Sequence, residues 1–123
     1  MNEKHTILYV DDEPVNLQLF RINLREKFNV LTVSSGADGL EMLMKEPKIE
    51  VVISDMKMPN MSGMEFIKLA KEKHPVINYY ILTGYDITDE IHDALDTGLI
   101  LKYFKKPFNM NEMIIEITKV VEP

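Results

Sequence analysis

The chain has 123 residues, of which 46% are hydrophobic and 28% charged, a composition typical of one globular domain with a substantial core. The formal net charge of -6 argues against direct binding of nucleic acid, because no basic stripe is available to neutralise phosphates. The sequence has no cysteine to indicate an oxidising compartment, and no apolar run long enough to span a bilayer. We therefore expect a cytoplasmic protein with one domain over residues 1–123, in contact with neither nucleic acid nor membrane.

The first part of the chain predicts two strands and two helices. Residues 6–10 are apolar throughout, as in a strand buried on both faces, and Pro14 suits the first turn of the helix that follows. Residues 30–33 predict a second strand, and Ser35 with Asp38 resembles the capping box of a second helix. The expected buried face of the first helix consists of Val15, Leu19 and Ile22, widened by Leu17, Phe20 and Leu24, and that of the second consists of Leu40, Leu43 and Met44.

The middle of the chain predicts a buried strand over residues 51–55, a β-branched apolar run that stops on Asp55. Ser62 and Glu65 have the spacing of a capping box, which predicts a helix over residues 63–73. The apolar residues expected to face the core from this helix are Met64, Ile67, Leu69 and Ala70.

Two further strand and helix pairs complete the pattern. Residues 79–82 predict a fourth strand that leads to Thr83, and residues 87–97 predict an amphipathic helix that Gly98 ends. Residues 100–104 predict the fifth strand, and Asn109 with Glu112 predicts the start of the last helix. The expected buried residues are Ile87, Ile91, Ala94 and Leu95 in the fourth helix, and Met110, Met113, Ile114, Ile117 and Val121 in the fifth.

The alternation of five strands with five helices, without repeats or linkers, predicts the α/β class. Right-handed crossovers then favour a doubly wound parallel sheet of order 2-1-3-4-5 with helices on both faces, a flavodoxin-like arrangement. In that order the carboxyl ends of strands one, three, four and five are neighbours at one edge of the sheet. Ligands of open α/β sheets bind at this edge.

The residues that end those strands predict the chemistry. Strand one ends at Asp11 and Asp12, strand three at Asp55, strand four at Thr83 and strand five at Lys106. Clustered carboxylates repel one another unless a cation intervenes, and oxygen ligands suit Mg²⁺. An ionised Asp55 could attack a phosphoryl donor and form an acyl phosphate, with a hydrogen bond from Thr83 and the charge of Lys106 in support.

Four motifs, in this order and at these intervals, carry a family resemblance: Val-Asp-Asp-Glu-Pro at 10–14, Ser-Asp-Met-Lys-Met-Pro-Asn-Met-Ser-Gly at 54–63, Leu-Thr-Gly at 82–84 and Lys-Pro-Phe at 106–108. Together they resemble the receiver domain of bacterial two-component response regulators, over essentially the whole chain. The resemblance implies that Asp55 accepts a phosphoryl group from a sensor histidine kinase or phosphotransfer protein. It also implies that Mg²⁺ binds Asp12, Asp55 and the backbone carbonyl of Lys57, with Asp11 acting through water.

The same resemblance assigns roles to the remaining site residues. Thr83 and Tyr103 would be the switch pair, Lys106 would contact the phosphoryl group, and the Lys106–Pro107 bond would be cis. Lys105 competes with Lys106 by composition, but strand alternation points the two side chains to opposite sides. The exposed faces of the fourth helix, fifth strand and fifth helix would change on phosphorylation.

Two more positions, Lys57 and Tyr85, are expected to tune the lifetime of the acyl phosphate, because they flank the approach of the hydrolytic water. Tyr85 would shield the phosphoryl group and Lys57 would hold its oxygens, which predicts slow self-dephosphorylation. The alternative is that both side chains point into solvent and have no effect.

The resulting hypothesis is a phosphorylation-dependent signalling switch, not an enzyme with a separate substrate, that acts on an output domain or partner protein and could form a phosphorylation-dependent homodimer. A Mg²⁺-dependent small-molecule phosphatase or phosphotransferase is the first alternative, although the chain has no insertion for a cap domain. A flavodoxin-like cofactor binder is the second, although Asp11, Asp12 and Glu13 would repel an anionic cofactor.

Overall fold

Five parallel strands form one sheet in the order β2-β1-β3-β4-β5, which confirms the expected doubly wound topology. The computed structural model describes residues 4–84, 87–107 and 109–123. The strands are β1 (Thr6–Val10), β2 (Asn29–Val33), β3 (Ile49–Asp55), β4 (Asn78–Thr83) and β5 (Lys102–Lys105). The helices are α1 (Pro14–Leu24), α2 (Gly36–Lys45), α3 (Gly63–Lys73), α4 (Asp89–Asp96) and α5 (Met110–Val121).

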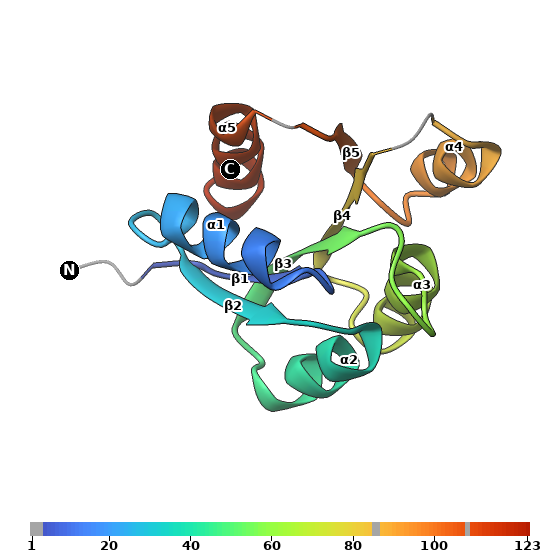
Figure 1. Cartoon of the computed structure of the whole chain (residues 1–123), viewed down its shortest axis with the longest axis horizontal. Helices are drawn as coiled ribbons and strands as arrows, with labels where there is room; N and C mark the ends of the chain where they lie inside the picture. The colour runs from blue at the N-terminus through green and yellow to red at the C-terminus, as the bar shows by residue number, and fades with distance from the viewer. Residues whose placement is uncertain (1–3, 85–86, 108) are drawn as a thin grey trace.

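The sheet lies between two layers of helices (Figure 1), as the crossovers require. Helices α1 and α5 cover one face, where Phe20 and Ile117 pack on alternate strand residues such as Ile7 and Ile53. Helices α2, α3 and α4 cover the other face of the sheet. The strand residues that alternate with the first set, such as Leu8 and Val52, are buried against these helices. Both faces of the sheet are therefore apolar, which is why the strands appear in the sequence as continuous apolar runs.

Helix α1 buries a different face from the one that its spacing suggested. Val15, Leu19 and Ile22 are 63%, 51% and 51% exposed, so the expectation that they form the core stripe is wrong. Phe20 and Leu24, which were expected only to widen that stripe, are buried, so this part of the prediction is confirmed. The helix carries apolar residues on most sides, so their periodicity does not fix its rotation, and packing of the Phe20 ring on the sheet does. Two other expected core residues are also exposed, Met44 on α2 at 70% and Leu69 on α3 at 44%.

The ends of the elements follow local hydrogen bonds. Ser62 and Glu65 form a complete capping box, with Glu65 N donating to Ser62 Oγ at 3.1 Å and Ser62 N to Glu65 Oε1 at 3.0 Å. Helix α4 begins two residues later than expected, because Thr88 is its N-cap. Strand β5 also begins later, because the Ile100 N–H is used by the carbonyl of Ala94 at the end of α4. In the described part of the chain, no helix combines the length and apolar character needed to cross a membrane.

Candidate functional site

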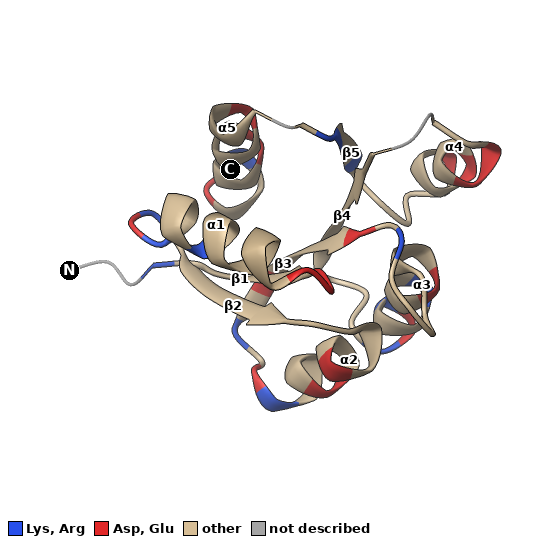
Figure 2. Ribbon diagram, in the orientation of Figure 1, with Lys and Arg blue, Asp and Glu red and all other residues tan. Residues whose placement is uncertain are grey.

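Three carboxylates meet where β1 and β3 end. The register of these parallel strands pairs Val10 with Ser54, so the next residues, Asp11 and Asp55, emerge side by side. One oxygen from each of Asp11, Asp12 and Asp55 lies within 4.8 Å of the others. In Figure 2 the ribbon is red, the colour of Asp and Glu, at the carboxyl ends of both strands. The acidic cluster opens into a hollow of about 420 Å³ lined by Asp12, Glu13, Asp55, Met56, Lys57, Gly84 and Lys106.

The turn after β3 fixes the position of Asp55. Gly63 approaches so closely that a Cβ atom there would collide with the Asp55 carbonyl oxygen, and its N–H donates to the Met56 carbonyl at 2.8 Å. Met56 N donates in turn to the Leu82 carbonyl on β4 at 2.9 Å. The Ser54 hydroxyl donates to the Asp55 carbonyl at 2.9 Å. Asp55 therefore lies on a rigid strand end, with only 8% of its surface exposed.

Lys106 is the lysine that reaches the carboxylates. Its Nζ lies 2.8 Å from Asp55 Oδ1 and 4.0 Å from Asp11 Oδ2. Its backbone N–H donates to the Thr83 carbonyl at 2.8 Å, and its bond to Pro107 is cis, as the resemblance implied. Lys105, the competing candidate, is the exposed last residue of β5.

The positive charge of Lys106 only partly offsets the effects of burial and of Asp11 on the ionised Asp55 carboxylate. Burial raises the pKa of the Asp55 carboxyl above its ordinary value, and the hydrogen bond from Lys106 opposes that shift. The negative charge of Asp11 raises the pKa further. A bound divalent cation would stabilise the ionised form of this cluster. The donors are all oxygens, so the set fits a hard ion such as Mg²⁺ better than a transition metal.

Thr83 and Tyr103 lie on neighbouring strands and share the face of the sheet that α4 covers. Tyr103 pairs with Ile81, two residues before Thr83, and packs against the core of that face. Thr83 is buried and Tyr103 is half-buried. Lys57 is exposed and lines the acidic hollow. Tyr85, the other expected lifetime residue, and Phe108 of the last motif lie outside the described residues.

Two residues at the site were not expected from the sequence. The Tyr9 hydroxyl donates to Asp11 Oδ2 at 2.6 Å, and Asn16 Nδ2 donates to the same oxygen at 3.1 Å. Tyr9 precedes Asp11 by two positions, so the two side chains point to the same side of β1. This spacing is the sequence signal that could have identified Tyr9. Asn16 comes from α1, whose rotation the sequence did not determine.

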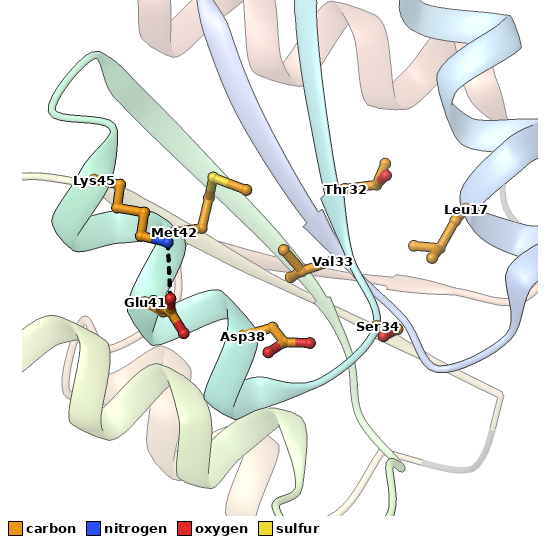
Figure 3. Close-up of a pocket in the computed structure, with 8 residues that line it drawn as sticks. All are labelled: Leu17, Thr32, Val33, Ser34, Asp38, Glu41, Met42 and Lys45. Carbon is orange, nitrogen blue, oxygen red and sulfur yellow. Dashed lines mark hydrogen bonds and ion pairs between the residues drawn. The ribbon is translucent and has the colours of Figure 1, made fainter.

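A second hollow, of about 400 Å³, lies between α2 and the edge strand β2 (Figure 3). Its two closest charged side chains, Glu41 and Lys45, pair with each other at 2.8 Å. The two hollows are similar in volume, but they differ in where their charged side chains come from. The acidic hollow brings charged groups from three strands to one point, and the charged groups of the second hollow all lie on α2.

Comparison with known proteins identifies the class that this fold and site define. The family model for the response regulator receiver domain matches residues 7–118. The chain belongs to this family. Members are receiver domains of two-component systems, which take a phosphoryl group from histidine kinases or phosphotransfer proteins and act as phosphorylation-dependent signalling modules. This membership argues against the phosphatase and cofactor-binding alternatives.

Individual relatives support the same assignment. The hydrogenase transcriptional regulatory protein HoxA of Cupriavidus necator is 33% identical over 99% of this chain and 25% of its own length. Sporulation initiation phosphotransferase F of Bacillus subtilis is 33% identical over 92% of this chain and 89% of its own length. The chain thus spans about a quarter of the hydrogenase regulator and most of the sporulation protein.

Solved structures agree in fold as well as sequence. A response regulator receiver domain protein from Clostridium thermocellum superimposes with a TM-score of 0.86 at 35% identity, over 93% of this chain and 91% of that one. An adenylate cyclase structure from Rhodopirellula baltica superimposes with a TM-score of 0.90 at 31% identity, over 95% and 87% of the two chains.

Proposed function

We propose that this chain is a signalling switch in which Asp55 accepts a phosphoryl group from a histidine kinase or a phosphotransfer protein. The observation that carries the proposal is the approach of Lys106 Nζ to Asp55 Oδ1, 2.8 Å, next to the two further carboxylates of Asp11 and Asp12. Asp12, Asp55 and the backbone carbonyl of Lys57 would hold Mg²⁺, with Asp11 acting through water. When bound, the ion would neutralise charge on the phosphoryl oxygens.

In the transfer step, an Asp55 carboxylate oxygen attacks the phosphorus of the phosphohistidine on the donor protein. The new O–P bond forms as the P–N bond breaks, and the bonding electron pair returns to the imidazole nitrogen. The Lys106 ammonium balances negative charge on the transferred phosphoryl oxygens, and Thr83 donates a hydrogen bond to one of them. The product is an acyl phosphate on Asp55, so the chain is a phosphoacceptor that labels and dephosphorylates itself rather than an enzyme with a separate substrate.

The response to phosphorylation would pass through Thr83 and Tyr103. Both side chains share the face of the sheet that α4 covers, so movement of Thr83 toward a phosphoryl group would free space for Tyr103. The surface of α4, β5 and α5 would then change and contact an output domain, a partner protein or a second copy of the chain. This output, a cytoplasmic location and a single domain over residues 1–123 are parts of the same proposal.

The exposed apolar side chains of α1 are the surface that we propose for the donor protein. Val15, Leu19 and Ile22, here called the α1 patch, are exposed on the helix that follows Asp11 and Asp12. Leu19 also lines a hollow of about 280 Å³ that reaches Lys106, so the patch is continuous with the site. A donor protein that covers Leu19 would bring its phosphohistidine close to Lys106 and so to Asp55, which is why an apolar surface at this position suits the donor.

Intact-mass measurement after incubation with Mg²⁺ and acetyl phosphate tests the function directly. We expect one phosphoryl group on the parent chain and none on Asp55→Asn. Asp38→Asn is the matched control, because Asp38 is an exposed aspartate at the second hollow. Undiminished labelling of Asp55→Asn would remove Asp55 from the role. Asp12→Ala should bind Mg²⁺ more weakly, and parent-like binding would remove Asp12 from the metal site.

A further inference from the structure

Asp11 is completely buried, and a buried tyrosine donates a hydrogen bond to it. The Tyr9 hydroxyl lies 2.6 Å from Asp11 Oδ2, and Tyr9 is 1% exposed. Because both side chains are buried, bulk water cannot replace the hydrogen bond between them.

The same Asp11 oxygen has two further neighbours. Asn16 Nδ2 donates to Oδ2 at 3.1 Å, and Lys106 Nζ lies 4.0 Å from it. The other oxygen, Oδ1, accepts the N–H of Glu13 at 3.0 Å. Two neutral donors therefore satisfy Oδ2, and the Lys106 ammonium stays 2.8 Å from Asp55 instead.

Tyr9 is held in place by its own packing. Its ring stacks on Phe20 of α1, with the centroids 4.1 Å apart and the planes 13° apart. Tyr9 also lies on β1, which has a strand on either side. The hydroxyl consequently has a fixed position relative to Asp11, as a group that orients another residue requires.

We propose that Tyr9 is a positioning residue of the acidic site, which holds Asp11 away from Lys106 and so keeps the three carboxylates open to a divalent cation. This inference deepens the proposed function and rests on it, because it concerns the same carboxylates. Without the hydroxyl, Asp11 Oδ2 retains the Asn16 amide as its hydrogen-bond donor, and the Lys106 ammonium, 4.0 Å away, is the charged neighbour that would move in to replace the lost bond. A lysine drawn to a position between Asp11 and Asp55 would place its positive charge among the carboxylates, where it competes with Mg²⁺ more than from its present place on Asp55 alone.

The test compares Tyr9→Phe with Tyr80→Phe by calorimetric titration with Mg²⁺ alone. Tyr80 is the matched control, since it is also fully buried in the sheet and its hydroxyl donates to a carboxylate, Glu116 Oε2, at 2.9 Å. Each variant loses one hydrogen bond from a tyrosine hydroxyl to a carboxylate, partly buried for Tyr80, and of the two tyrosines only Tyr9 bonds to a carboxylate of the site. We expect the dissociation constant of Mg²⁺ to rise about tenfold in Tyr9→Phe, as for other residues that orient metal ligands, and to stay at the parent value in Tyr80→Phe.

Two further measurements separate positioning from a general loss of stability. In the absence of metal, the Lys106 side-chain nitrogen should change its NMR chemical shift in Tyr9→Phe and keep it in Tyr80→Phe. Asn16→Ala removes the second hydrogen-bond donor to Asp11 Oδ2, at a residue that is only partly buried, and should weaken Mg²⁺ binding several-fold. If Tyr9→Phe does not fold, Mg²⁺ binding by Asn16→Ala decides whether the donors to Asp11 matter for the metal site.

Three results would overturn the inference. They are parent-like Mg²⁺ affinity in a folded Tyr9→Phe, an equal loss in both tyrosine variants, or parent-like affinity in Asn16→Ala when Tyr9→Phe is unfolded. Failure of the parent chain itself to bind Mg²⁺ would instead refute the proposed metal site, and the role of Tyr9 with it. The two failures are therefore distinguishable.

Discussion

The ammonium of Lys106 lies 2.8 Å from Asp55 Oδ1 but 4.0 Å from Asp11 Oδ2, so one lysine is shared unequally between two buried carboxylates. The nearer contact places a positive charge beside the oxygen that would receive a phosphoryl group. Lys106 is also partly buried, which keeps its ammonium within the hollow. This asymmetry leads to the first prediction.

Lys106→Ala should slow phosphorylation of Asp55 by acetyl phosphate about tenfold to a hundredfold, because charge at the phosphoryl oxygens is lost. Lys105→Ala is the matched control, since Lys105 is the adjacent lysine and is exposed at the end of β5. Quench-flow labelling with intact-mass detection measures both rates. Equal slowing in the two variants would mean that general charge, rather than the position of Lys106, matters.

Asp55→Asn should stabilise the fold at neutral pH. Burial raises the pKa of Asp55 above its ordinary value of 3.8, and a group with a raised folded-state pKa loses its stabilising contribution as pH rises through that pKa. The ionised form at neutral pH is therefore unfavourable in the folded chain. Removing the charge should therefore raise the free energy of unfolding and the Tm at neutral pH.

The pH dependence of that gain is its control. The difference between Asp55→Asn and the parent should shrink as the pH falls toward 3.8, where the parent carboxyl is increasingly neutral. Thermal unfolding by circular dichroism across this range measures it. If Asp55→Asn were less stable than the parent at neutral pH, the ion pair with Lys106 would outweigh the cost of burial.

Helix α4 should respond to phosphorylation more than α1. It has only eight residues, and within it Ile91 and Ala94 alone are buried, so little apolar packing resists its movement. The polar contacts of this region with α3 include an ion pair of 4.0 Å between Lys68 and Glu90, and a hydrogen bond from Lys71 to the carbonyl of Gly98, which follows α4. Hydrogen exchange with and without beryllofluoride and Mg²⁺ should change more in α4 than in α1. A change confined to α1 would contradict the proposed output surface.

The α1 patch should affect the rate of phosphoryl transfer from a donor protein, and affect the rate of labelling by a small-molecule donor only slightly. Leu19→Ser should slow transfer from a phosphorylated kinase about tenfold more than it slows labelling by acetyl phosphate, because interface anchors contribute about that much to binding. The kinase used is the one that labels the parent fastest in a panel. Met44→Ser, at an apolar position on α2 that is more exposed than Leu19 (70% against 51%), should leave the ratio of the two rates at the parent value. An unchanged ratio in Leu19→Ser would exclude the α1 patch as the docking surface.

The lifetime of the acyl phosphate should depend on Tyr85. We expect slow self-dephosphorylation of the parent and faster loss in Tyr85→Ala, because a bulky side chain beside the line of attack excludes water. Loss of the phosphoryl mass with time, after removal of the donor, measures this. Lifetimes in Tyr85→Ala equal to the parent's, or longer, would reject the shielding role.

The sequence alone was enough for the topology and for the residues at the strand ends. Apolar runs of strand length alternate with amphipathic helices, and right-handed crossovers leave few ways to arrange them. In such a sheet the carboxyl ends of β1, β3, β4 and β5 lie together, so Asp11, Asp55, Thr83 and Lys106 could be assigned to one site before any contact was known.

Tertiary structure decided the features that depend on contacts between elements. Periodicity could not set the rotation of α1, since apolar residues occur on most of its sides, and stacking of Phe20 on Tyr9 turned Val15, Leu19 and Ile22 outward. The pairing of Lys106 with Asp55 depends on where β5 ends relative to β3, two strands away. The bond from Tyr9 to Asp11 depends on the burial that both residues gain only when the helices cover the sheet.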